Sequence, residues 1–385
     1  MSGNLSEILL CAAFNTETTL KTFRMKRVVP LLQKIPTTAT KSLPDLYSFY
    51  SSHYNGIVTN PTLATIPVDD HGFHRGHCVF DTCNVTTNNQ VYALDMHLDR
   101  LTTSARAAGI LNHPSKADLR HIVLSTVAAA SSSQGKRQNN EPCFVRYWMT
   151  SGRGDFSISP KDCGDTGFFV VVHSDGHSPI VPLPAVTAVT VKEEAVNLKP
   201  PQLSTMKSNN YLLNALLQME AEKAGADMGI QLDPSTGDLT ESSVSTVAVV
   251  LDEQDNDALP NSNDVVFVVP PFDRILASTT VRRAMDLLPS TIVTKNGTTR
   301  NVRLEQRHVP QDELYRAKEL IDFGGHFCRP IGQVDDTVVK GWERNEDEQE
   351  EDGVFLVYEA VARALLKDMD TNEEMLDDVD YDIYE

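Results

Sequence analysis

The chain has 385 residues, enough for two domains of ordinary size, and its 41% hydrophobic and 23% charged residues are typical of a folded globular protein. Its net charge of −19 is concentrated at the C-terminal end, where residues 343–385 hold 17 acids and three bases. The rest of the chain has no basic stripe, so we do not expect it to bind nucleic acid. No apolar run approaches the roughly 20 residues that span a bilayer, so no membrane segment is expected.

Residues 1–44 are predicted to be an extension that precedes the folded domains. Residues 20–41 are basic, rich in threonine and free of acids, which is typical of a cleaved organellar presequence but also of a disordered extension. Two locations therefore stay open: the cytoplasm, or a plastid or mitochondrion if this segment directs import. The six cysteines are scattered, which favours a reducing compartment over a disulfide framework.

The first domain is predicted to be an α/β unit over residues 45–178. Residues 79–94 predict a β-hairpin, because two runs of β-forming residues flank a pair of asparagines. A helix is expected to follow, with Asp95 as its N-cap and Gly109 at its end. Composition predicts three further elements: a helix at 117–130 and strands at 144–149 and 168–172.

The second domain is predicted over residues 179–368, after a proline-rich linker at 173–184. A helix is expected at 210–223, with Gly225 at its C-terminal stop. The elements that follow it are a strand–turn–strand segment at 229–250 and a helix that begins near Thr280.

The C-terminal part of the chain alternates between acidic and apolar stretches. Residues 343–352 are predicted to be an acidic surface insert, and residues 369–385 an acidic solvated tail. Between them, apolar residues recur at helical spacing from Val354 to Leu366, which predicts a helix that docks on the second domain.

Lys207 is the residue with the clearest chemical context. It lies just before the predicted helix at 210–223, among small polar residues and outside any basic cluster. A lysine that forms a Schiff base needs such a position, since its side chain must move while its backbone is anchored.

Three other features suit a phosphorylated cofactor with a pyridine ring. Glu241 follows a predicted strand and turn, and a carboxylate there would keep a ring nitrogen protonated. Arg100 offers a fixed positive fork for the phosphate. At the start of a predicted helix, hydroxyls and backbone amides could bind the same phosphate; they belong to Ser278, Thr279 and Thr280.

Five motifs occur in one order along most of the chain: IPVDDHGFHRGHCVFDT (66–82), DMHLDRLTTSA (95–105), VRYWMTSGRGDFSISP (145–160), MKSNNYLLNALLQMEAEKAGA (206–226) and PPFDRILASTT (270–280). Together with the Glu241 segment, they resemble the class IV (fold type IV) pyridoxal-phosphate-dependent aminotransferases. The resemblance runs from about Tyr50 to Ala364 and is closest to the plant-type D-amino-acid transaminase branch.

This resemblance implies an α/β (α+β) fold with a small N-terminal α/β domain and a larger C-terminal α/β pseudo-barrel domain, in a homodimer. It implies that Lys207 holds pyridoxal 5'-phosphate covalently and then moves the proton, and that Glu241 pairs with the pyridine nitrogen. The other cofactor-binding residues that it implies are Arg100, Ser278, Thr279 and Thr280 at the phosphate and Tyr211 at the ring.

The resemblance leaves the substrate open. Bacterial D-amino-acid transaminases bind the substrate carboxylate with a tyrosine and an arginine, and those positions hold Phe80 and Ser151 here. Candidate substitutes nearby are Arg146, Arg153 and His77.

Four functions follow from these observations. The first is a transaminase that moves an amino group between a small amino acid, with the D-configuration favoured, and a 2-oxo acid. The second is a 4-amino-4-deoxychorismate lyase, since the spacing from Lys207 to Asn210 matches both branches; a branched-chain aminotransferase is third, because that family usually has one more residue there. The fourth is a catalytically silent binding protein that uses the acidic tail.

The histidines of HGFHRGHC (71–78) suit zinc by residue type. Because Gly72 and Gly76 are expected to interrupt any helix there, we interpret the segment as a turn that lines the active-site mouth and expect no metal.

Overall fold

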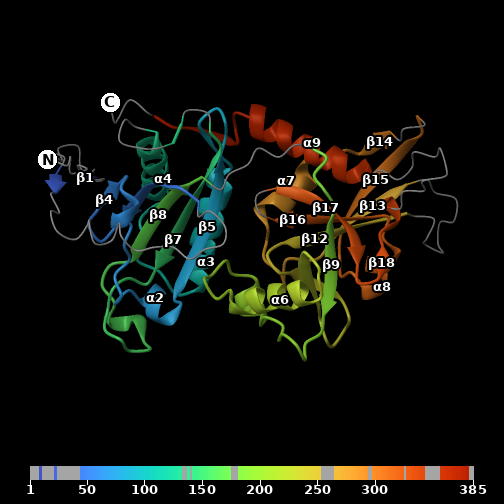
Figure 1. Ribbon diagram of the computed structural model, residues 1–385, viewed down its shortest axis with the longest axis horizontal. Helices are drawn as coiled ribbons and strands as arrows, with labels where there is room; N and C mark the ends of the chain where they lie inside the picture. The colour runs from blue at the N-terminus through green and yellow to red at the C-terminus, as the bar shows by residue number, and fades with distance from the viewer. Residues whose placement is uncertain are drawn as a thin grey trace. The chain divides into compact units, whose positions relative to one another are not determined.

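The computed structural model describes residues 44–131, 137–138, 141–174, 181–252, 264–293, 297–324, 327–342 and 356–380. It also gives two short antiparallel strands near the N-terminus, β1 (Ile8–Leu10) and β2 (Lys21–Phe23). The chain divides into two compact units, and the main boundary falls between Ser178 and Pro179 (Figure 1). Within the described ranges, no helix is long and apolar enough to cross a bilayer.

Two later segments return to the first unit: Lys207–Asn209 and the chain from Met369 onwards. The predicted ranges assign both segments to other parts of the chain. Sequence order alone does not reveal such a return, because it depends on pairing between residues far apart in the chain.

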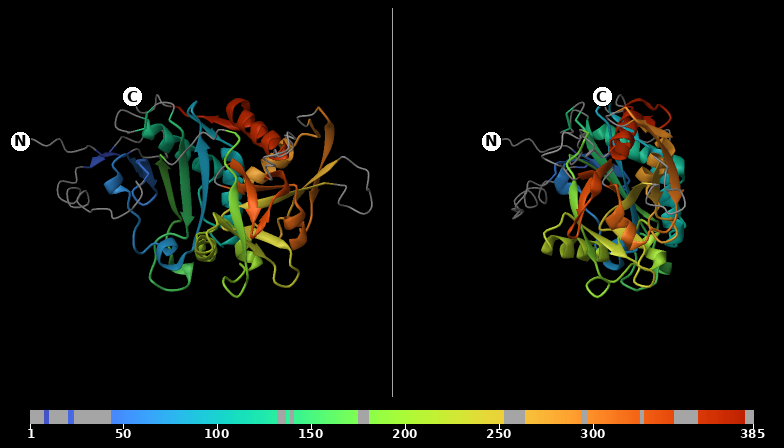
Figure 2. Two further views of the ribbon diagram at one scale, coloured as in Figure 1. Left: turned by 45° about the vertical axis from the view of Figure 1, so that its right-hand side comes forward. Right: turned by 90° about the vertical axis from the view of Figure 1, so that its right-hand side faces the viewer.

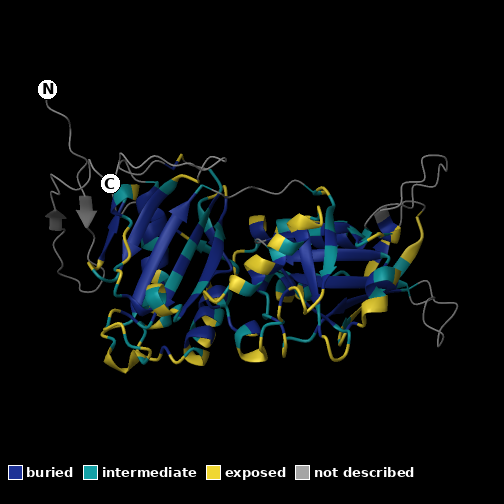
Figure 3. Cartoon of the chain, turned by 60° about the horizontal axis from the view of Figure 1, so that its bottom comes forward, coloured by how far each residue is buried: buried dark blue, intermediate teal, exposed yellow. Residues whose placement is uncertain are grey.

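The first unit is built on a seven-stranded antiparallel sheet with the order β19-β6-β5-β7-β8-β3-β4. Its strands are β3 (Leu46–Ser51), β4 (Gly56–Val58), β5 (Cys78–Val85), β6 (Gln90–Tyr92), β7 (Cys143–Thr150), β8 (Gly167–His173) and β19 (Leu376–Asp378). Every residue of β8 is buried, and dark blue marks the buried strands in Figure 3. The hairpin expected at 79–94 and the two strands expected at 144–149 and 168–172 are confirmed as β5–β6, β7 and β8.

Two helices pack on this sheet: α3 (Leu94–Ala107) lies against β5, and α4 (Lys116–Ala130) against β3 and β8. The predicted N-cap of α3 was wrong. Ala93 occupies that position with a left-handed φ of 54° and makes no side-chain cap bond, whereas Asp95 lies in the first turn. A carboxylate in the first turn is favoured by the helix dipole, which explains why the sequence pattern resembled a cap.

The second unit is built on a mixed sheet with the order β11-β10-β9-β17-β16-β12-β13-β15-β14, and β18 pairs with β17. Its strands are β9 (Val186–Val191), β10 (Met228–Leu232), β11 (Leu239–Ser242), β12 (Thr246–Asp252), β13 (Val265–Val269), β14 (Thr291–Val293), β15 (Thr299–Gln306), β16 (Glu319–Gly324), β17 (Phe327–Val334) and β18 (Thr337–Val338). All five residues of β13 are buried, so this strand is covered on both faces. The segment at 229–250 forms three strands and not the predicted two.

The helices of the second unit are α5 (Pro201–Ser204), α6 (Leu212–Lys223), α7 (Thr279–Leu287), α8 (Gln311–Arg316) and α9 (Leu356–Thr371). Single 3-10 turns occur at η1 (Pro61–Leu63), η2 (Pro160–Asp162) and η4 (Lys340–Trp342). α6 packs against β9 and β10 through Leu217 and Ala221, and Gly225 follows it with a left-handed φ of 79°, as its predicted stop requires.

The acidic C-terminal tail is not solvated throughout, which corrects the expectation for residues 369–385. The predicted helix is longer than expected and ends at Thr371, and β19 then pairs with β6 in the sheet of the first unit. Arg120 forms an ion pair with Asp377, and the Nε2 of Gln90 donates to Asp378 at 2.8 Å. The predicted insert at 343–352 lies outside the described residues.

Glu319, on β16, holds the first turn of α9. This helix is red in Figure 2. Its two carboxylate oxygens accept the backbone N–H groups of Val357 and Tyr358 at 3.0 and 2.9 Å. The side chain is 1% exposed, and this burial raises the pKa of Glu319 to about 7.

We expect Glu319→Gln to lower the free energy of unfolding at pH 5 by about 1–3 kcal/mol, because the amide NH₂ that replaces the carboxyl hydroxyl cannot accept a hydrogen bond and leaves a buried N–H unpaired. The pKa of Glu319 is higher in the folded protein than in the unfolded chain, so the neutral carboxyl group stabilises the fold fully below about pH 4.5. This stabilisation is lost as the pH rises through about 7. The difference in melting temperature from the parent should therefore shrink between pH 5 and pH 8. Thermal unfolding at several pH values tests this, with Glu373→Gln at an exposed position as the control; a difference that stays constant with pH would contradict it.

Candidate active site

Lys207 is anchored through its backbone to β5 of the first unit. Its carbonyl accepts the N–H of Phe80 at 3.0 Å, Asn209 donates to the carbonyl of Cys78 at 2.9 Å, and its own N–H donates to the Oγ of Ser104 on α3 at 3.2 Å. The side chain is half-buried. A lysine held in this way combines a fixed backbone with a long, movable side chain.

The ammonium group of Lys207 lies over an aromatic ring. Its Nζ is 4.7 Å from the centroid of Phe80. Phe80 pairs with Trp148 and Thr82 with Arg146 across β5 and β7, so alternation puts Phe80, Thr82 and Arg146 on one face of the sheet. The Nε of Arg146 donates to the Oγ1 of Thr82 at 3.0 Å, and its guanidinium carbon is 5.9 Å from the Phe80 ring. This face therefore holds two cations and an aromatic ring.

Arg100 is fixed by a buried carboxylate. Its Nε and Nη2 donate to the two oxygens of Asp81 at 2.8 and 2.7 Å, and the Nδ1 of His97 lies 2.8 Å from the same carboxylate. Burial alone would raise the pKa of Asp81, but the charges of Arg100 and His97 hold it well below its usual range. Arg100 is thus a pre-oriented guanidinium that stays charged beside an ionised partner.

Two of the three arginine or histidine candidates for a substrate carboxylate make strong contacts elsewhere. Arg153 forms a forked ion pair with Asp69, with N–O distances of 2.7 to 3.1 Å. The Nε2 of His77 is 2.6 Å from the carbonyl of Ala108, and its Nδ1 is 3.2 Å from the Nδ1 of His71. Arg146 is the candidate that the sheet register places on the same face as Phe80.

The histidine segment is partly helical: Gly72 does not interrupt the helix, which corrects that part of the prediction, whereas Gly76 ends the helix as expected. α2 (His71–Arg75) includes Gly72 and ends at Gly76, whose φ of 68° makes it a C-cap. Among the described residues, no group of three or more His, Cys, Asp or Glu is arranged to hold a metal ion.

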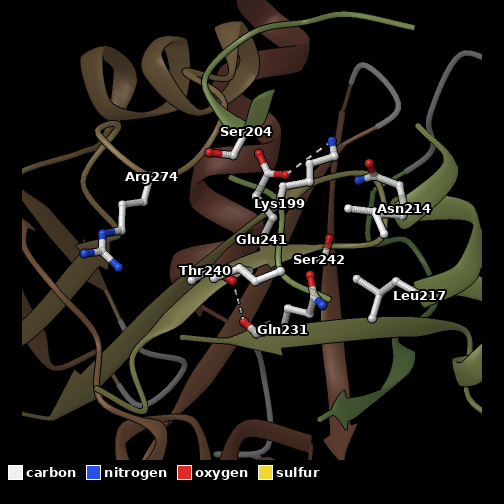
Figure 4. A pocket seen from close by; sticks show the side chains of 11 residues that line it. Lys199, Ser204, Asn214, Leu217, Gln231, Thr240, Glu241, Ser242 and Arg274 are labelled. Carbon is white, nitrogen blue, oxygen red and sulfur yellow. Dashed lines mark hydrogen bonds and ion pairs between the residues drawn. The ribbon is translucent and has the colours of Figure 1, made fainter. Parts of the chain in front are cut away.

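Glu241 lies on β11 of the second unit, and Figure 4 shows its ion pair with Lys199. Oε1 accepts the N–H of Leu276 at 2.7 Å, and Oε2 is 4.0 Å from the Nζ of Lys199. The same Nζ is 4.4 Å from the centroid of the Tyr211 ring. Lys199 is the residue that the sequence analysis missed, because a lysine in front of two prolines gives no chemical signal by itself.

The N-terminus of α7 holds the three residues predicted for a phosphate. Ser278 is the N-cap, and its Oγ accepts the N–H of Val281 at 3.3 Å, so this hydroxyl stabilises the helix. Thr279 and Thr280 are the first two helical residues, whose backbone amides lie outside the intrahelical hydrogen-bond ladder. Such amides and the positive end of the helix dipole suit an anion.

Comparison with known proteins gives the family. The sequence model described as amino-transferase class IV matches residues 78–332. The chain belongs to the class IV aminotransferases. It is 32% identical over 293 residues to the chloroplastic D-amino-acid transaminase of Arabidopsis thaliana, which covers 76% of this chain and 71% of that protein. It is 25% identical to a putative branched-chain-amino-acid aminotransferase of Methanocaldococcus jannaschii, over 74% of this chain and 88% of that protein.

The fold is similar to that of solved members of the family. The branched-chain amino acid aminotransferase of T.th., complexed with N-(5'-phosphopyridoxyl)-L-glutamate, is similar with a TM-score of 0.67 and 18% identity, over 87% of this chain and 99% of that chain. The expected α/β, two-domain, fold type IV architecture is confirmed by this likeness, and the family shows that this class IV aminotransferase is an enzyme.

Proposed function

We propose that this class IV aminotransferase is a pyridoxal-phosphate-dependent transaminase that moves an amino group between a small D-amino acid and a 2-oxo acid. The observation that carries the proposal is Lys207, with its backbone clamped to β5 and α3 and its ammonium group over Phe80. The 32% identity with a D-amino-acid transaminase supports the D-configuration.

The residues present fit pyridoxal 5'-phosphate. The half-buried lysine suits the aldehyde of the cofactor, and the carboxylate with a fixed orientation suits its ring nitrogen. The pre-oriented guanidinium and the helix N-terminus both suit its phosphate. A structural relative is complexed with a phosphopyridoxyl compound. When bound, this cofactor supplies the electron sink for the reaction at the substrate's α-carbon.

The roles of the side chains follow from their surroundings. Lys207 would hold the cofactor and then, through its free amine, move the α-proton. Glu241 would keep the proton at the ring nitrogen, since the N–H of Leu276 fixes the orientation of its carboxylate. Tyr211 would contact the ring. The phosphate would be bound by Arg100, Ser278, Thr279 and Thr280, with Ser278 acting mainly as the helix cap.

Arg146 is our candidate for the substrate carboxylate. Thr82 and Phe80 fix its guanidinium on the same sheet face as the Lys207 ammonium. Phe80 would form the apolar wall of the substrate site. Arg153 and His77 are weaker candidates, because Asp69 and the carbonyl of Ala108 already engage them.

The family resemblance also supports a homodimer as the assembly. The Arabidopsis relative is named chloroplastic, which supports a plastid as the location if residues 1–44 direct import; cytoplasmic and mitochondrial locations are the alternatives.

A branched-chain aminotransferase is the second candidate function, favoured by the identity with the Methanocaldococcus protein.

A substrate panel tests the proposed function. Purified protein with added pyridoxal 5'-phosphate should convert D-alanine or D-aspartate with 2-oxoglutarate or pyruvate at least about tenfold faster than the L-enantiomers or L-leucine. Faster turnover of L-leucine and L-isoleucine would establish the branched-chain alternative instead. Release of pyruvate from 4-amino-4-deoxychorismate without an amino acceptor would identify a lyase.

A further inference from the structure

Lys199 lies beside the carboxylate that faces the ring nitrogen in the proposed function, and little of its side chain is exposed. The side chain is 9% exposed, and that of Glu241 is 15% exposed. Figure 4 shows the two side chains pointing toward one another. Lysines are rarely this buried unless an opposite charge accompanies them, so the contact with Glu241 accounts for the position of the ammonium group.

The backbone around Lys199 fixes where its side chain begins. Pro200 and Pro201 follow it, and Pro200 has an extended conformation with φ −57° and ψ 145° before α5 starts. A residue before proline is itself confined to extended backbone, which restricts the position of the Lys199 Cβ. The Tyr211 ring, 4.4 Å from Nζ, then provides a favourable surface for the ammonium group.

The contact borders a small cavity. Lys199 and Glu241 line a cavity of about 10 Å³ together with Asn214, Gln231 and Ser242, which is room for about one water molecule. Burial lowers the pKa of Lys199, and the charge of Glu241 acts in the opposite direction. In such an environment a charge 4 Å away acts several times more strongly than in bulk water.

Two neighbours of the Glu241 carboxylate differ in kind. Leu276 donates to Oε1 and sets its direction, whereas the Lys199 ammonium attracts Oε2 and favours the ionised form. A neutral side chain at position 199 would remove the second neighbour and leave the first unchanged.

We propose that Lys199 is a positioning residue for the cofactor: it keeps the Glu241 carboxylate ionised and oriented for the pyridine ring. This proposal rests on the proposed function. Lys199 does not bind the cofactor covalently, a role that remains with Lys207.

The test is the affinity of the apoprotein for pyridoxal 5'-phosphate, measured by absorbance and fluorescence titration. Lys199→Met should raise the dissociation constant roughly tenfold, which corresponds to about 1.4 kcal/mol. Lys199→Arg retains the charge and should stay within about threefold of the parent protein. Lys223→Met, at an exposed position on α6, is the matched control and should have no effect.

A double-mutant cycle shows whether Lys199 acts through Glu241. In a Glu241→Gln background, Lys199→Met should cost less than about twofold, because the carboxylate that it serves is gone. An undiminished tenfold loss in that background, or parent-like affinity of the Lys199→Met single variant, would overturn the proposal while leaving the proposed function intact. If the parent protein itself failed to bind pyridoxal 5'-phosphate, both the proposed function and the role of Lys199 would be wrong.

The folding of each apoprotein is checked by its melting temperature. If Lys199→Met is unfolded, Lys199→Gln replaces it, because a polar neutral side chain keeps the cavity hydrated and still removes the charge. A Lys199→Gln protein that is folded and binds the cofactor as tightly as Lys199→Arg would also overturn the proposal.

Discussion

Replacing Lys207 by alanine should abolish transamination, with a loss of at least about 10³-fold in kcat, because the covalent attachment and the proton carrier are removed together. The substitution should leave the fold intact. The contacts that anchor this residue to Phe80 and Ser104 are made by its backbone, which alanine retains.

Borohydride reduction followed by peptide mapping is the direct measurement. The pyridoxyl label should lie on Lys207 in the parent protein and be absent from the Lys207→Ala variant. Lys199, which precedes Lys207 by eight residues in the sequence, provides an informative alternative, since a label on that residue would show that the assignment of the two lysines is reversed. Lys223→Ala, at an exposed position, serves as the control for unspecific labelling.

Glu241→Gln should leave the protein folded and able to bind the cofactor but slow the chemical step by about 10²–10³-fold. The amide oxygen of glutamine can still accept the N–H of Leu276, so the side chain should keep its place. A neutral amide, however, cannot stabilise a positive charge on the ring nitrogen, and its NH₂ group would face the Lys199 ammonium.

Single-turnover kinetics with a D-amino acid separate this effect from binding. The rate of the half-reaction should fall while the amino acid concentration for half-saturation changes little. Glu220→Gln, on α6, is the matched control. A near-parental rate in Glu241→Gln would remove Glu241 from its proposed role.

Local patterns predicted much of the fold correctly. The helices α3, α4, α6 and α7 and the strands β5, β7 and β8 each have an apolar period or a composition that their own residues reveal. The family could be recognised from the sequence because its motifs include most of the proposed cofactor residues. These signals depend on neighbours in the chain, which is why they could be read without a structure.

The features that escaped prediction depend on residues far apart in the chain. The ion pair of Lys199 and Glu241 joins residues 42 positions apart, and that of Arg153 and Asp69 joins residues 84 apart. The charged tail resembled solvated chain because its acids outnumber its apolar residues. Its strand β19 pairs with the edge strand β6, and its Asp377 forms an ion pair with Arg120. Both partners lie in a distant part of the sequence.

The pairing of β19 with β6 has a consequence for the order in which the protein folds during synthesis. Domains generally fold as they emerge from the ribosome, starting from the N-terminus. The first unit cannot follow that rule to completion, because its sheet contains residues 376–378, which come after the second unit in the sequence. Until those residues emerge, β6 is an open edge that can pair with other chains. The unit that is translated first is therefore completed only after the second unit has been synthesised.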